Sequence, residues 1–256
     1  MADTLQALAD PDCGWFYRAD GRSFEKIPGS PIAYWIGRGM TFVFETSPRL
    51  DECAEVKKGL STGKNELFLR LWWEVEEEKT SLNNSELSLK QDKKPKWFPY
   101  NKGGEFRKWY GNDDYLINWE DNGRDLKLFP GSILRNQNYY FQPSVTWSDV
   151  SSGCIAFRVK EGSGLHDGAG ASFFASPETR NLLLGIMNSS CVKEVSKVLS
   201  PTLHFEIGQV SSYPVRFGSS DEQAEYGRMV EDNVIFSKED WDSNELSWGF
   251  EKHPLI

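Results

Sequence analysis

The strongest structural signal in the sequence lies between Ser176 and Pro201. Ser176 is a favourable N-cap, Pro177 suits the first helical position, and Glu178 suits the positive end of a helix. Apolar residues follow at spacings of three and four, as on one face of a helix. That face comprises Leu184, Met187, Cys191, Val195 and Val198. The pattern predicts one helix over 178–199 that Pro201 ends.

Most other apolar runs are short and read as strands. They are 56–63 with its glycine loop, 67–75, 114–120, 139–141, 144–147, 155–159, 173–175 and 204–210. Ser30 as N-cap and Pro31 at the first helical position predict a second helix over 32–45. Residues 4–12 and the acidic residues 221–233 also read as helical. Mixed strands with few helices predict an α+β fold with a mixed, twisted β-sheet and a few packed helices.

The 256 residues are enough to bury a core without disulfides or metals. No apolar run approaches the ~18 residues of a membrane span, and no secretion signal precedes Pro11. The cysteines and histidines lack the spacing of a zinc site, so we expect that no metal binds. We expect the cysteines to be free thiols, as in the cytoplasm. His166 follows a glycine-rich stretch; we expect a solvated loop histidine, with a catalytic base as the alternative.

The net charge of -9 argues against nucleic acid, but it is unevenly distributed. Residues 217–256 carry a net charge of -7, which leaves -2 for residues 1–216. Within the latter, residues 90–108 carry a net charge of +5. The average therefore hides a basic segment.

Several catalytic motifs are absent from the sequence. Gly59 to Lys64 resembles a P-loop but has three residues between its glycines instead of four, and Asn65 replaces the required Ser or Thr. No GxGxxG fingerprint lies in a strand–turn–helix setting, and no Asn-Pro-Pro-Tyr stretch occurs. A self-sufficient enzyme is thus disfavoured. The glycine amides, Ser61, Thr62, Lys64 and Asn65 remain candidates for contacting a phosphate backbone.

Residues 93–110 combine cations with aromatic rings, the chemistry that neutralises phosphates and packs on sugars or bases. The candidates are Lys93, Lys94, Lys96, Trp97, Tyr100, Lys102, Arg107, Lys108 and Trp109. A second cluster supplies guanidinium and amide groups that read base edges: Arg135, Asn136, Gln137 and Tyr139. Composition alone leaves two alternatives open, an aromatic-anchored loop with solvated lysines and a sugar-binding β-domain.

Longer motifs resemble the PglX-type adenine-specific DNA methyltransferases of BREX phage-defence systems. They are 26–35, 59–63, 96–104, 107–111, 115–120, 185–189, 200–202, 208–210 and 237–243. The resemblance covers nearly the whole chain. Members of this family are much longer, and their N-terminal half carries the S-adenosylmethionine fold and the Asn-Pro-Pro-Tyr motif.

The resemblance implies that this chain is the target-recognition region, similar to the TaqI-type specificity domain. It implies an N-terminal linker and helix (1–48), a DNA target-recognition domain (49–216) and the acidic start of a C-terminal helical region (217–256). It also implies that this chain binds no cofactor, whereas the full-length enzyme binds S-adenosylmethionine. The chain itself would then be a fragment, the product of a truncated gene, or a split subunit.

The implied partners are double-stranded DNA, the methyltransferase catalytic domain or subunit, and other BREX components, with no membrane. Alternatives are a non-enzymatic protein-interaction fragment of the defence complex, and a diverged self-sufficient methyltransferase or nuclease.

Overall fold

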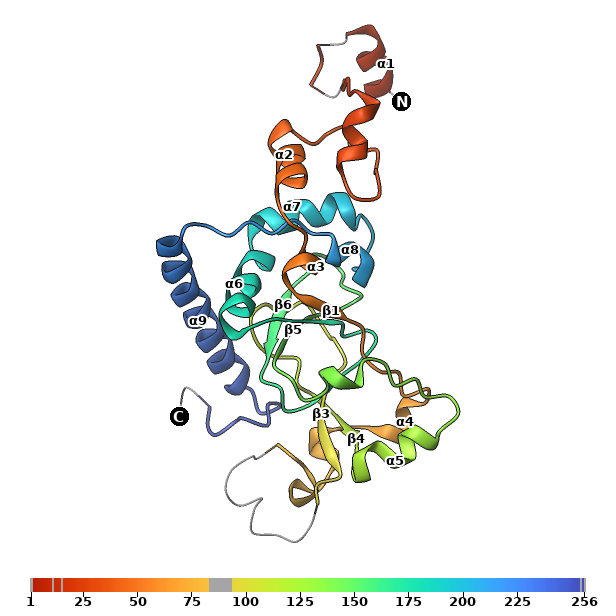
Figure 1. Ribbon diagram of the computed structural model, residues 1–256, viewed down its shortest axis with the longest axis vertical. Coiled ribbons are helices and arrows are strands. Elements are labelled where there is room, and N and C mark those ends of the chain that lie inside the picture. The colour runs from red at the N-terminus through yellow and green to blue at the C-terminus, as the bar shows by residue number, and fades with distance from the viewer. Residues whose placement is uncertain (1, 11, 15, 83–93, 254, 256) are drawn as a thin grey trace. The chain divides into compact units, whose positions relative to one another are not determined.

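The structure is a computed structural model that describes residues 2–10, 12–14, 16–82, 94–253 and 255. The chain divides into two compact units, Met1–Pro48 and Arg49–Ile256 (Figure 1). No helix in the described part is long and apolar enough to cross a membrane.

The first unit contains α1 (Ala2–Ala9), the 3₁₀ turn η1 (Gly21–Lys26) and α2 (Arg38–Thr46). The predicted helix start at Ser30 is wrong, because Ser30 adopts a left-handed conformation with φ of 48°. The N-cap is instead Gly37, seven residues later, and the helix begins at Arg38. An ion pair of 2.7 Å between Lys26 and Glu45 joins η1 to α2.

Two four-stranded sheets organise the second unit. The first sheet is antiparallel and has the order β1 (Glu55–Lys57), β8 (Ser172–Phe174), β5 (Ser144–Trp147), β6 (Phe157–Lys160). Trp147, Phe157 and Phe173 on these strands are fully buried. The indole of Trp147 donates to the carbonyl of Phe205 at 2.8 Å, so the ring is buried without an unpaired donor.

The second sheet is mixed, with the order β2 (Leu69–Leu71), β4 (Tyr115–Asn118), β3 (Trp97–Asn101), β7 (Leu165–His166). Strand β7 runs parallel to β3, whereas β4 is antiparallel to both β2 and β3. Helices α4 (Asn65–Phe68) and α5 (Glu120–Leu128) contribute Phe68 and Leu126 to its core. Helices and mixed strands confirm the α+β prediction.

The predicted helix over 178–199 is two helices, α6 (Pro177–Met187) and α7 (Ser190–Leu199). The Ser176 hydroxyl accepts from the amide of Thr179, as its N-cap position predicts. The break follows from Asn188, whose side-chain amide exchanges two hydrogen bonds of 3.0 and 2.9 Å with the backbone of Phe157. Ser189 then caps α7.

Helix α9 (Ser220–Asp242) extends beyond the predicted 221–233 and lies alongside α6 (Figure 1). Gly185 permits this approach, because a Cβ at that position would lie 2.5 Å from Val230. Residues 217–256 therefore belong to the same compact unit as the two sheets.

Two strand predictions, 139–141 and 204–210, are wrong, and a third, 67–75, is confirmed only over β2, because local turns and short helices replace the other strand residues. Residues 67–75 form the end of α4, the short β2 and a 3₁₀ turn, η2 (Trp72–Glu74). Residues 139–141 follow the 3₁₀ turn η5 (Gln137–Tyr139), and Phe141 is left-handed. The 204–210 segment leads into α8 (Ile207–Ser211). The remaining elements among the described residues are α3 (Leu50–Cys53) and η3 (Glu77–Lys79).

Candidate nucleic-acid interface

Two loops far apart in the sequence lie side by side and are here called the paired loops, residues 58–65 and 131–137. Ser61 and Ile133 exchange two backbone hydrogen bonds, of 2.9 and 2.8 Å. The Asn136 side-chain amide donates to the carbonyl of Lys58 at 2.8 Å. The two groups of candidates proposed from the sequence, 61–65 and 135–137, thus meet on one surface.

Glycines in the paired loops are required by geometry. A Cβ on Gly59 would lie 1.9 Å from the carbonyl oxygen of His166, which accepts from the amide of Leu60. Gly63 has a φ of +70°, and its Cβ would lie 2.2 Å from the carbonyl oxygen of Gly131. Gly59 thus allows its loop to approach β7, and Gly63 allows it to approach the 131–137 loop, so the resemblance to a phosphate-binding loop has a structural cause.

Exposed polar side chains cover the paired loops: Lys58, Lys64, Asn65, Arg135, Asn136 and Gln137. Neither lysine forms an ion pair within the described part of the chain, and the same holds for Arg135. Thr62 differs because it is 3% exposed and donates to Asn65 Oδ1 at 2.6 Å, which fixes the turn before α4. Ser61 is half-buried.

Tyr139 follows the paired loops but packs inward. Its ring lies 4.8 Å from that of Phe174, and the ammonium of Lys57 lies 5.2 Å from its centre. Tyr139 therefore lies near the paired loops but packs beneath them.

The basic–aromatic segment 93–110 does not form one continuous surface. Lys93 lies outside the described residues. Lys94 is exposed. Lys96 forms an ion pair with Glu120 at 3.1 Å, while Trp97 and Tyr100 on β3 are 8% and 2% exposed. The two rings are part of the sheet core.

The later cations of this segment also have partners inside the protein. Lys102 lies over the ring of Tyr115 at 5.6 Å. Arg107 pairs with Asp240 and stacks on Trp241 at 4.9 Å, and Lys108 donates to the carbonyl of Asn188 at 2.6 Å.

The half-buried Trp109 is left-handed, with a φ of +72°, and bonds β6 through its backbone. It thus helps fix the segment against the first sheet.

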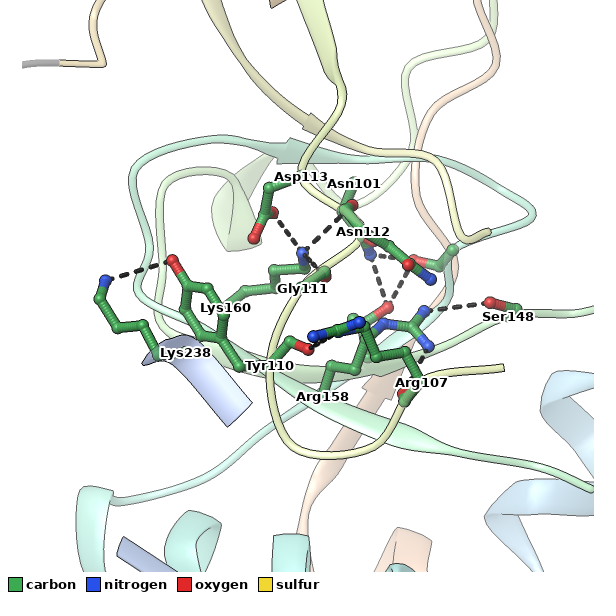
Figure 2. Close-up of polar contacts among 12 residues, drawn as sticks. Asn101, Arg107, Tyr110, Gly111, Asn112, Asp113, Ser148, Arg158, Lys160 and Lys238 are labelled. Atoms are coloured by element: carbon green, nitrogen blue, oxygen red, sulfur yellow. Dashed lines mark hydrogen bonds and ion pairs between the residues drawn. The ribbon is translucent and has the colours of Figure 1, made fainter. Parts of the chain in front are cut away.

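Two cations on β6, the buried Arg158 and the half-buried Lys160, hold the 104–113 loop, and neither was predicted from the sequence (Figure 2). Arg158 is fully buried and donates to the carbonyl of Arg107 at 3.2 Å and to Ser148 Oγ at 3.0 Å. Burial lowers the pKa of Arg158 to about 10. Lys160 donates to the carbonyl of Gly111 at 2.9 Å and pairs with Asp113. Burial lowers the pKa of Lys160, and Asp113 opposes that shift. Side chains alternate between the two faces of a strand, so the sequence Phe-Arg-Val-Lys places Arg158 and Lys160 on the same face. This pattern could have identified the two cations.

His166 is buried, so its prediction as a solvated loop residue is wrong. It lies on β7 and is 5% exposed. Burial lowers its pKa to about 4, and the imidazole is neutral at pH 7. All four cysteines are free thiols, and Cys191 is exposed. No group of three or more potential metal ligands occurs in the described part of the chain.

The chain is similar to segments of two larger proteins. It is 38% identical over 261 aligned residues to the adenine-specific methyltransferase PglX of Lacticaseibacillus casei (strain Zhang), covering 98% of this chain and 21% of the relative. It is 37% identical over 237 residues to the adenine-specific methyltransferase BrxX of Escherichia coli O9:H4 (strain HS), covering 91% and 18%. The chain thus spans about a fifth of each relative. No family model matches it.

Proposed function

Because this chain matches PglX- and BrxX-type adenine-specific methyltransferases along nearly its whole length, we propose that it is a DNA target-recognition segment of such an enzyme. In this role it selects the DNA sequence whose adenine is methylated at N6, in a phage-defence system. The transfer of the methyl group belongs to a part of the relatives that the chain does not span.

The paired loops are the observation that carries this proposal. They gather Lys58, Lys64 and Arg135, whose charges have no ion-pair partner in the described structure, beside the exposed amide of Gln137. Cations without internal partners are available to neutralise phosphates, and guanidinium and amide groups match guanine and adenine edges. We assign phosphate contacts to Lys58 and Lys64, and base contacts to Arg135 and Gln137.

The remaining candidates take secondary roles in this proposal. Lys94 and Lys102 are further phosphate contacts, whereas Arg107 and Lys108 position the 104–113 loop. The recognition domain is 49–216, and 217–256 begins a helical region. S-adenosylmethionine binds the catalytic part, which is a partner of this chain in the cytoplasm together with other BREX components.

Salt dependence of DNA binding tests the proposal. Anisotropy titrations of a labelled random duplex with the chain, at several salt concentrations, give the slope of log affinity against log salt. Lys64→Ala removes an exposed charge without an internal partner and should reduce that slope by about 0.9, the value for one phosphate contact. Lys193→Ala on α7 is the matched control, since Lys193 is exposed but distant in sequence from both loops.

The control should leave the slope unchanged. Equal slopes for Lys64→Ala, Lys193→Ala and the unmodified chain would remove the paired loops from the DNA interface.

A further inference from the structure

An apolar side chain is exposed in the middle of the paired loops, and the proposed DNA contacts do not use it. Ile133 is 48% exposed, although isoleucine is among the residues most often buried. It lies between Gly131, which Gly63 approaches, and Arg135, one of the proposed base contacts. Single exposed apolar residues are common on protein surfaces, so the significance of Ile133 depends on its neighbours.

The backbone around Ile133 directs its side chain away from the core. Ile133 forms an antiparallel bridge with Ser61, so the chain is extended there and successive side chains point to opposite faces. Leu134 packs against the buried hydrophobic cluster of the second sheet. Ile133 and Arg135, on either side of Leu134, therefore project outward, and both are exposed.

The facing loop shows the same alternation. Leu60 and Thr62 are buried, whereas Ser61 between them is half-buried. Ser61 and Ile133 lie opposite each other and exchange both backbone hydrogen bonds, so their side chains lie on the same face. The outward face of the paired loops thus presents a hydroxyl, a branched apolar group and a guanidinium, from Ser61, Ile133 and Arg135.

These three groups match the chemistry of the DNA major groove. An apolar side chain contacts the thymine C5-methyl group, which is displayed in that groove, while a guanidinium binds guanine O6 and N7. The major groove is about 12 Å wide and admits a two-stranded ribbon, whose strands lie only about 4.8 Å apart. Residues two apart in an extended chain are about 6.6 Å apart, close to two base-pair steps of about 3.4 Å.

We propose that the paired loops enter the major groove and that Ile133 contacts the C5-methyl group of a thymine within two base pairs of the guanine that Arg135 reads. This inference rests on the proposed DNA-recognition function and adds to it the groove, a base and a further specificity-determining residue. The contact selects thymine over cytosine, which has no C5-methyl group.

Replacing thymine by uracil tests the contact, because uracil lacks only the C5-methyl group. Selection by the whole chain from a randomised duplex pool gives the preferred sequence. Copies of that duplex, each with one thymine replaced by deoxyuridine, are then titrated by fluorescence anisotropy. One replacement, within two base pairs of a guanine, should weaken binding about 4-fold, the equivalent of burying one methyl-sized group.

Variants at position 133 assign the effect to this side chain. Ile133→Ala should bind the thymine and deoxyuridine duplexes equally, because the contact is removed. Ile133→Val keeps a branched apolar side chain and should retain most of the discrimination. Ile235→Ala is the matched control, since Ile235 is 52% exposed but lies on α9, and it should discriminate as the unmodified chain does.

The outcomes separate this inference from the function on which it rests. A preferred sequence without thymine, or one in which no deoxyuridine weakens binding, would overturn the inference and leave the proposed function intact. Discrimination that persists undiminished in Ile133→Ala would overturn it as well, because another residue would then read the methyl group. Equal affinity for selected and random duplexes would overturn the proposed function itself and the inference with it.

Discussion

Replacing Gly63 by Ala should separate the paired loops. The new Cβ would lie 2.2 Å from the carbonyl oxygen of Gly131, whereas ordinary contact begins at 3.4 Å, so the loops must part by about 1.2 Å. Such a shift lengthens the two Ser61–Ile133 hydrogen bonds, now 2.9 and 2.8 Å, beyond hydrogen-bonding range. The φ of +70° adds backbone strain that a glycine does not experience.

The expected loss of unfolding free energy follows from these contributions. Each lost backbone hydrogen bond costs about 1 kcal/mol, and the left-handed conformation costs a non-glycine residue about 1–2 kcal/mol. We therefore expect Gly63→Ala to lower the unfolding free energy by about 3–4 kcal/mol, measured by urea denaturation.

Gly153→Ala is the matched control. Gly153 also lies in a loop, but its φ is not left-handed, and nothing lies within 4 Å of an added Cβ. It should be neutral or slightly stabilising. A Gly63→Ala variant as stable as Gly153→Ala would refute the described contact between the loops.

Three further outcomes are expected. Lys108→Met should lower the unfolding free energy by about 2 kcal/mol, because it removes a charged hydrogen bond to Asn188. It should leave the salt dependence of DNA binding unchanged. A reduced salt dependence together with full stability would contradict this. The pKa of His166 is about 4 in the folded chain and 6.5 in the unfolded chain, so the unfolded chain binds a proton first as pH falls. The unfolding free energy should therefore fall by about 3 kcal/mol between pH 6.5 and pH 4. His166→Gln should show a shallower pH dependence in urea denaturation. Gln137→Ala should cost about 1–3 kcal/mol of binding at one base pair of the target, and an equal loss on random DNA would exclude it as a base reader.

Local signals predicted part of the fold. The N-cap at Ser176 was predictable because capping depends on neighbouring residues alone. The break at Asn188 was not, since it depends on a hydrogen bond to Phe157, 31 residues away. Ser30 met the same local rules as Ser176 but is left-handed, so a cap signal alone does not determine a helix.

The candidate site was harder to predict, because composition does not reveal a cation's partners. Arg107 and Lys108 are as basic as Lys64, yet Asp240 and Asn188 engage them. Those partners lie 133 and 80 residues away in the sequence. Conversely, the pairing of residues 58–65 with 131–137 depends on sheet topology, which no motif encodes.

A segment exchange tests the central claim most directly. The matching region of the Lacticaseibacillus casei PglX is replaced by this chain, and genomic adenine methylation is mapped by single-molecule sequencing. If this chain selects the target, methylated adenines should occur in a sequence context different from that of the unmodified relative. Methylation in the relative's own context would contradict the account.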